Sequence, residues 1–97
     1  MDEHQHRLWL RMLKTIERYR GGTISLSQLV GGLEAAFDAG EFRNLALAER
    51  FYDLWQPLEI TNAVKGNTVT YQEIVSDVEA MRDFLIEHLN TEQTWTT

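Results

Sequence analysis

Apolar residues recur every three or four positions between Thr70 and Asn90, which is the period of an amphipathic α-helix. The stripe consists of Tyr71, Ile74, Val75, Val78, Met81, Leu85 and Leu89. A capping-box pattern, Thr70-Tyr71-Gln72-Glu73, precedes it and marks the start of the helix. Because the apolar face of such a helix must be covered, this segment requires another element of the chain to pack against it.

A first helix is predicted from about Glu3 to Arg20, where Gly21 and Gly22 end it. Leu10 lies outside the apolar stripe, so we expect it to contact a terminal tail or a second subunit. The stripe itself is Trp9, Met12, Leu13, Ile16 and Tyr19, and the far side carries the bases Arg7, Arg11, Lys14 and Arg18.

A second helix begins at the capping-box pattern Ser25-Leu26-Ser27-Gln28 and stops at Gly40. Its stripe is Leu26, Leu29, Val30, Leu33 and Phe37. The interior pair Gly31-Gly32 costs about 1 kcal/mol per glycine relative to alanine. These glycines either admit the backbone of a partner or allow tight packing within the protein.

A third helix is predicted from the region between Glu41 and Asn44, and its aromatic residues cover a wide face. Pro57 lacks a backbone donor and disfavours helical geometry at the preceding residue. The helix is therefore expected to kink near Pro57 and continue toward Val64, or to break there. In the alternative, residues 60–64 and 68–71 form a small hairpin.

These elements together predict an all-α fold, a compact four-helix bundle in one domain over residues 1–97. The length suits a single core, and the 43% of hydrophobic residues and 25% of charged residues are typical of globular proteins. Residues 91–97 are polar apart from Trp95, so we expect a loose tail there.

The net charge of −6 argues against nucleic acid as the main partner, because phosphate attracts basic surfaces. Residues 1–20 hold five bases and three acids, so the remainder carries all of the net negative charge. The chain has no cysteine, opens on a polar acidic segment, and lacks an apolar run of about 18 residues. We therefore expect a soluble cytoplasmic protein with no membrane contact and a basic protein as its partner.

Enzymatic chemistry has little support in the sequence. His4, His6 and His88 do not have the spacing of helical metal sites, so we predict no bound metal or cofactor. Glu73 and Asp77 are one turn apart, but nothing near them indicates a shifted pKa. Ser25 is explained as a helix cap, and no nucleophile elbow or phosphate-binding glycine loop is present. We predict no catalytic residues.

The strongest candidate for a binding surface is the outward face of the last predicted helix. Two like-charge pairs one turn apart, Glu73 with Asp77 and Asp83 with Glu87, each cost a few tenths of a kcal/mol. Phe84 is predicted to lie among these acids as an exposed aromatic. Aromatic residues are enriched in interface cores, and surrounding charges steer a partner, although a solvated helix face is the simpler interpretation.

The stretch from Tyr19 to Leu29 resembles the opening of the second helix in small bacterial immunity proteins of the colicin D immunity type. Gly22, Ile24 and Ser25 carry this resemblance, which covers residues 19–29. It implies a compact helical bundle whose clustered carboxylates block the basic active site of a toxin. It assigns no individual inhibitory residue.

The sequence thus favours a non-enzymatic protein-binding module, with toxin immunity as its most concrete form. Asp77, Asp83 and Glu87 would attract a basic protein, Phe84 would anchor it, and Glu73 would lie at the flank. The alternative is a self-associating structural or regulatory protein, such as a homodimer, whose contacts involve the third helix and the basic first helix.

Overall fold

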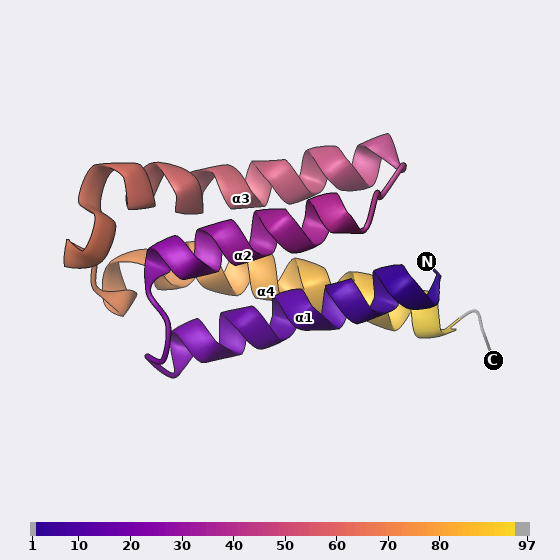
Figure 1. Ribbon diagram of the computed structural model, residues 1–97, viewed down its shortest axis with the longest axis horizontal. Helices are drawn as coiled ribbons and strands as arrows, with labels where there is room; N and C mark the ends of the chain where they lie inside the picture. The colour runs from indigo at the N-terminus through magenta and orange to yellow at the C-terminus, as the bar shows by residue number, and fades with distance from the viewer. Residues whose placement is uncertain (1, 95–97) are drawn as a thin grey trace.

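Four antiparallel helices form the molecule, and the computed structural model describes residues 2–94 (Figure 1). They are α1 (Glu3–Arg20), α2 (Leu26–Ala39), α3 (Leu45–Lys65) and α4 (Tyr71–Thr94). Both α1 and α3 pack against α2 and α4, so α1 and α3 occupy diagonal positions. The prediction of an all-α four-helix bundle is confirmed.

Local sequence signals explain where the first three helices begin. Asp2 and Ser25 each complete a capping box, with Gln5 and Gln28 as the reciprocal partners. Asn44 caps α3 by accepting a hydrogen bond of 3.1 Å from the backbone N–H of Leu47. These caps satisfy backbone donors that would otherwise have no partner in the helix.

The predicted apolar stripes meet in one core to which all four helices contribute. Trp9 and Phe51 are the largest of its fully buried side chains. Complete burial of one large apolar side chain contributes about 1.5–3 kcal/mol. The other fully buried members are Met12, Ile16, Leu29, Leu33, Leu58, Ile74, Val78, Met81 and Leu85.

The interior glycines of α2 have different surroundings. A Cβ on Gly32 would lie 3.3 Å from Cγ2 of Thr15 on α1, whereas a Cβ on Gly31 would meet no atom within 4 Å. Tight packing within the bundle therefore explains Gly32, and Gly31 remains an open position on the exposed side of α2.

Helix α3 continues through Pro57 to Lys65, so the alternative of a break there is wrong. The hairpin alternative is also wrong, because residues 60–64 are helical and the described chain holds no strand. Leu58, directly after the proline, is fully buried, and this packing compensates for the missing backbone donor. A short 3-10 turn (Gly66–Thr68) then leads to α4.

Helix α4 extends to Thr94, beyond the predicted end near Asn90. Residues 91–94, expected to belong to a loose tail, therefore have helical backbone. Trp95 and the remainder of the predicted tail lie outside the described residues. The start of α1 and the end of α4 lie at the same end of the bundle (Figure 1).

Candidate functional site

The five residues predicted to bind a partner all lie on α4, but they do not form one cluster. Glu73, Asp83 and Glu87 are exposed, whereas Asp77 and Phe84 are half-buried. Glu73 and Glu87 are separated by about 21 Å along the helix axis, given 1.5 Å per residue. Asp83, Phe84 and Glu87 are within about one turn of one another. The candidate surface is therefore centred on the second half of α4.

The expectation that Phe84 is an exposed aromatic is wrong. Its ring packs against the core, with its centroid 5.8 Å from that of Trp9 and 6.4 Å from that of His88. Phe84 is covered because the fully buried indole of Trp9 reaches from α1 to this part of α4. Only part of the ring is accessible to a partner.

Glu73 has partners within the protein. One carboxylate oxygen pairs with Nζ of Lys65, and the other accepts hydrogen bonds from the backbone N–H and the hydroxyl of Thr70, at 3.2 and 3.1 Å. The Lys65 ammonium, followed by the Thr70 donors, lowers the pKa of Glu73. Glu73 thus caps α4, and its charge is balanced locally.

The remaining acids are placed differently. Neither Asp77 nor Asp83 forms an ion pair with any residue in the range 2–94. Glu87 lines an open hollow of about 280 Å³ together with Phe84, His88 and Arg50 of α3. We call it the α3–α4 hollow, because side chains of both helices line it. It brings a carboxylate and an aromatic ring of α4 next to a guanidinium of α3.

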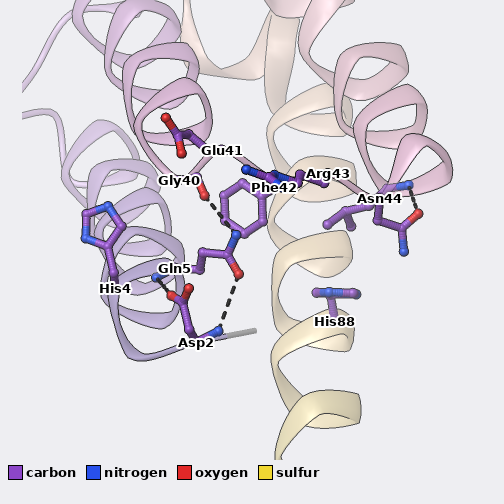
Figure 2. A pocket seen from close by; sticks show the side chains of 10 residues that line it. Asp2, His4, Gln5, Gly40, Glu41, Phe42, Arg43, Asn44 and His88 are labelled. Atoms are coloured by element: carbon purple, nitrogen blue, oxygen red, sulfur yellow. Dashed lines mark hydrogen bonds between the residues drawn. The ribbon is translucent and has the colours of Figure 1, made fainter.

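Sequence reasoning missed a larger pocket, of about 490 Å³, at the end of the bundle where α1 and α3 begin (Figure 2). Phe42 lies in it and stacks on Phe37, with ring centroids 4.9 Å apart. Gly40 is buried behind Phe42, and Gln5 donates a hydrogen bond of 2.8 Å to the Gly40 carbonyl. The signal in the sequence was Phe42 itself, an aromatic residue between the stop at Gly40 and the start of the third helix.

The chemistry of this pocket is mixed. His4 lies on the α1 side and His88 on the α4 side, so the two imidazoles do not converge (Figure 2). The guanidinium of Arg43 and the carboxylates of Asp2 and Glu41 give the lining both signs of charge. Glu41 has a φ of +48°, a conformation that non-glycine residues rarely adopt. No single class of ligand is favoured by this lining.

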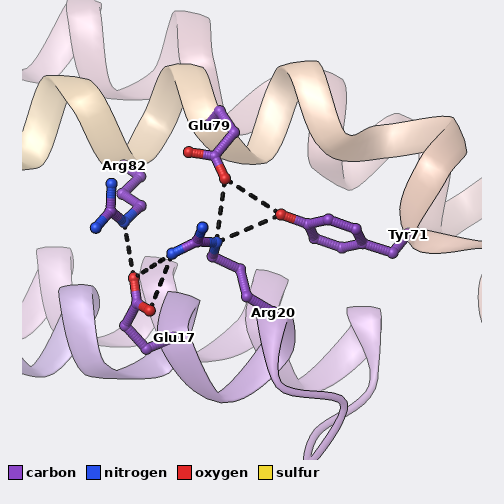
Figure 3. A network of polar contacts seen from close by, with 5 residues as sticks. All are labelled: Glu17, Arg20, Tyr71, Glu79 and Arg82. Carbon is purple, nitrogen blue, oxygen red and sulfur yellow. Dashed lines mark hydrogen bonds and ion pairs between the residues drawn. The ribbon is translucent and has the colours of Figure 1, made fainter.

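A polar network joins α1 to α4 on the other side of α4 (Figure 3). Glu17 pairs with Arg20 at 2.9 Å and with Arg82 at 2.7 Å, and Arg20 also reaches Glu79 at 3.1 Å. The hydroxyl of Tyr71 donates to Glu79 at 3.2 Å.

Hydrogen bonding to Arg82 is the main reason that the pKa of Glu17 is lowered, and bonding to Tyr71 and Glu17 raises the pKa of Arg20. Every charged member of the network has a partner within it. The network is therefore a structural link between the two helices.

Comparison of the chain with protein-family models, curated proteins and solved structures finds no match. Within residues 2–94, histidine and acidic side chains form no group of three or more that would hold a metal ion. Each helix in that range is too short or too polar to cross a lipid bilayer.

Proposed function

We propose that this protein is a non-enzymatic binding module that holds a basic protein against the second half of α4. The observation that carries the proposal is the α3–α4 hollow, where Glu87 and the accessible part of Phe84 lie side by side. Asp83 precedes Phe84 in the chain and has no ion pair within the described part of the protein. A partner's lysine or arginine entering the hollow would meet a carboxylate and an aromatic ring together.

Electrostatics favours a basic partner over a neutral one. Asp83 adds negative charge next to Phe84, Asp77 lies about 10 Å before Phe84 along the helix axis, and the net charge of −6 attracts a basic protein from a distance. The guanidinium of Arg50 lines the same hollow. An incoming base must therefore displace this guanidinium or share the carboxylate of Glu87 with it. Glu73 contributes less than its sequence position suggested, because Lys65 already balances it.

The most concrete form of the proposal is immunity to a toxin. The resemblance of residues 19–29 to colicin D immunity proteins motivates this choice, and a basic toxin active site has the charge that the α4 acids would attract. In this form the protein acts in the cytoplasm of a bacterium.

The test compares Asp77→Asn/Asp83→Asn with Glu34→Gln/Glu59→Gln, a control that removes two acids from the side of the bundle formed by α2 and α3. Each purified variant is crosslinked to interacting proteins in an extract of the native host at low salt. The proposal expects a basic protein that wild type and control capture equally and that Asp77→Asn/Asp83→Asn loses. Equal capture of every partner by all three proteins would contradict it.

A further inference from the structure

The exposed large hydrophobic side chains of the described protein lie on only two helices. Leu10 on α1 is 42% exposed, and on α3 Leu45, Ile60 and Val64 are 78%, 52% and 77% exposed. Ile60 and Val64 are one turn apart, so they adjoin each other on the surface of α3. These two helices are the diagonal pair of the bundle.

Four exposed bases accompany Leu10 on α1. Arg7, Arg11, Lys14 and Arg18 are all exposed, and their spacing places them in one stripe along the outside of the helix. None of the four forms an ion pair within residues 2–94, in contrast to Arg20 and Arg82 in the polar network. We call these four residues the basic ridge. Leu8 and Leu10 line a shallow hollow of about 500 Å³ beside it, together with Arg7, Arg11 and Lys14.

Acids accompany the apolar residues on α3. Glu49 and Asp53 are exposed, one turn apart, and form no ion pair with the described residues. Helical geometry places them on the same outward face as Ile60 and Val64, opposite the buried Phe51 and Leu58. We call Glu49, Asp53, Ile60 and Val64 the outer face of α3.

The basic ridge and the outer face of α3 are complementary in charge, and both offer apolar side chains. They cannot meet within one molecule, because α1 and α3 lie at diagonal corners of the bundle (Figure 1) and each helix buries the opposite face in the core. Two copies of the chain can bring them together. The helices have similar lengths, about 27 and 32 Å, so they can lie side by side along most of their extent.

We propose that the protein self-associates head to tail, with the basic ridge of one copy seated on the outer face of α3 of the next. Such a contact uses two different surfaces, so each added copy leaves one ridge and one outer face unoccupied, and assembly continues into chains or a ring. A few ion pairs around three or four apolar side chains make a weak, salt-sensitive interface of the transient class. Ile60 or Val64 would enter the hollow beside Leu10.

Neither surface includes the α3–α4 hollow or the α4 acids, so this inference is independent of the proposed function. The observations favour an acidic surface of a second copy of this chain as the partner that binds the basic ridge. Nucleic acid or an anionic membrane would be repelled by the remainder of the molecule. Residues 1–20 have a net positive charge, so residues 21–97 are more negative than the −6 of the whole chain.

The experiment uses two complementary variants and sedimentation velocity at salt concentrations of about 50 mM and 500 mM. Arg11→Gln/Lys14→Gln disables the ridge and leaves the outer face of α3, while Glu49→Gln/Asp53→Asn does the reverse. Wild type should form species larger than a dimer as its concentration rises at low salt, and should revert to monomer at high salt. Each variant alone should stay monomeric.

The decisive sample is the equimolar mixture of the two variants at low salt. The intact ridge of one variant can bind the intact outer face of α3 of the other variant. The remaining ridge and outer face of that pair are both disabled, so the mixture should stop at a one-to-one dimer. Asp77→Asn/Asp83→Asn should associate like wild type, which separates this result from the test of the α4 surface. A wild type that stays monomeric up to about 1 mM, or a mixture that stays monomeric, would overturn the proposal. The limit is set at about 1 mM because a dissociation constant of that size corresponds to a binding free energy of only about 4 kcal/mol.

Discussion

The indole Nε1 of Trp9 donates a hydrogen bond of 2.8 Å to the main-chain carbonyl of Leu85. This bond joins α1 to α4 across 76 positions of the sequence, inside the core. The same indole contacts the rings of Phe42, Phe84 and His88. Trp9 therefore supports both the pocket at the end of the bundle and the aromatic part of the proposed binding surface.

Replacing this indole should be costly. Trp9→Phe removes the donor to Leu85 and leaves a cavity in a fully buried position, so we expect a loss of about 2–4 kcal/mol in the free energy of unfolding. Trp55 is a matched control, because its indole also donates to a carbonyl, that of Val30 at 3.0 Å, but is only half-buried. Urea denaturation should show a smaller loss for Trp55→Phe, and equal losses would contradict the central role of Trp9.

Two glycine substitutions should have effects of opposite sign. A Cβ on Gly40 would lie 2.2 Å from a ring carbon of Phe42, so Gly40→Ala must displace this ring and should destabilise the protein by about 1–3 kcal/mol. Gly31→Ala adds a methyl group in open space within α2 and should stabilise the protein by about 0.5–1 kcal/mol. Thermal unfolding of both variants measures the difference, and a stable Gly40→Ala would show that Phe42 has room to move.

Glu17 should make stability depend on acidity. Because ion pairing lowers its pKa in the folded protein, it stabilises the fold above the pKa of an unfolded glutamate, about 4.3, and this contribution is lost as the pH falls further. Its side chain is 51% exposed, so the contribution is at most about 1 kcal/mol. Glu17→Gln should be less stable than wild type at pH about 7, and the gap should close toward pH about 3.

The measurement for Glu17 is the urea midpoint of both proteins at the two pH values, with Arg82→Gln and the double variant as controls. Glu17 and Arg82 are direct partners at 2.7 Å, so the double variant should lose less stability than the two single losses added together. A gap between wild type and Glu17→Gln that is equal at both pH values would show that the ion pairs of Glu17 do not stabilise the fold.

The sequence by itself determined the four helices, most of their ends and the side that each turns to the core. These features depend on residues within a few positions of one another, such as the capping box at Ser25 and the stripe from Ile74 to Leu85. The sequence also predicted the basic side of α1 and the position of Leu10 outside the apolar stripe, because helical spacing alone fixes which residues share a face.

Only the tertiary structure decided how the helices modify one another's surfaces. Trp9 covers part of Phe84 from another helix, Lys65 neutralises Glu73, and the packing around Leu58 carries α3 through Pro57. The pocket beside Phe42 likewise exists only where three helix ends meet. A helical period gives the direction of a side chain, but its burial and its charge partners depend on residues that are distant in sequence and close in space.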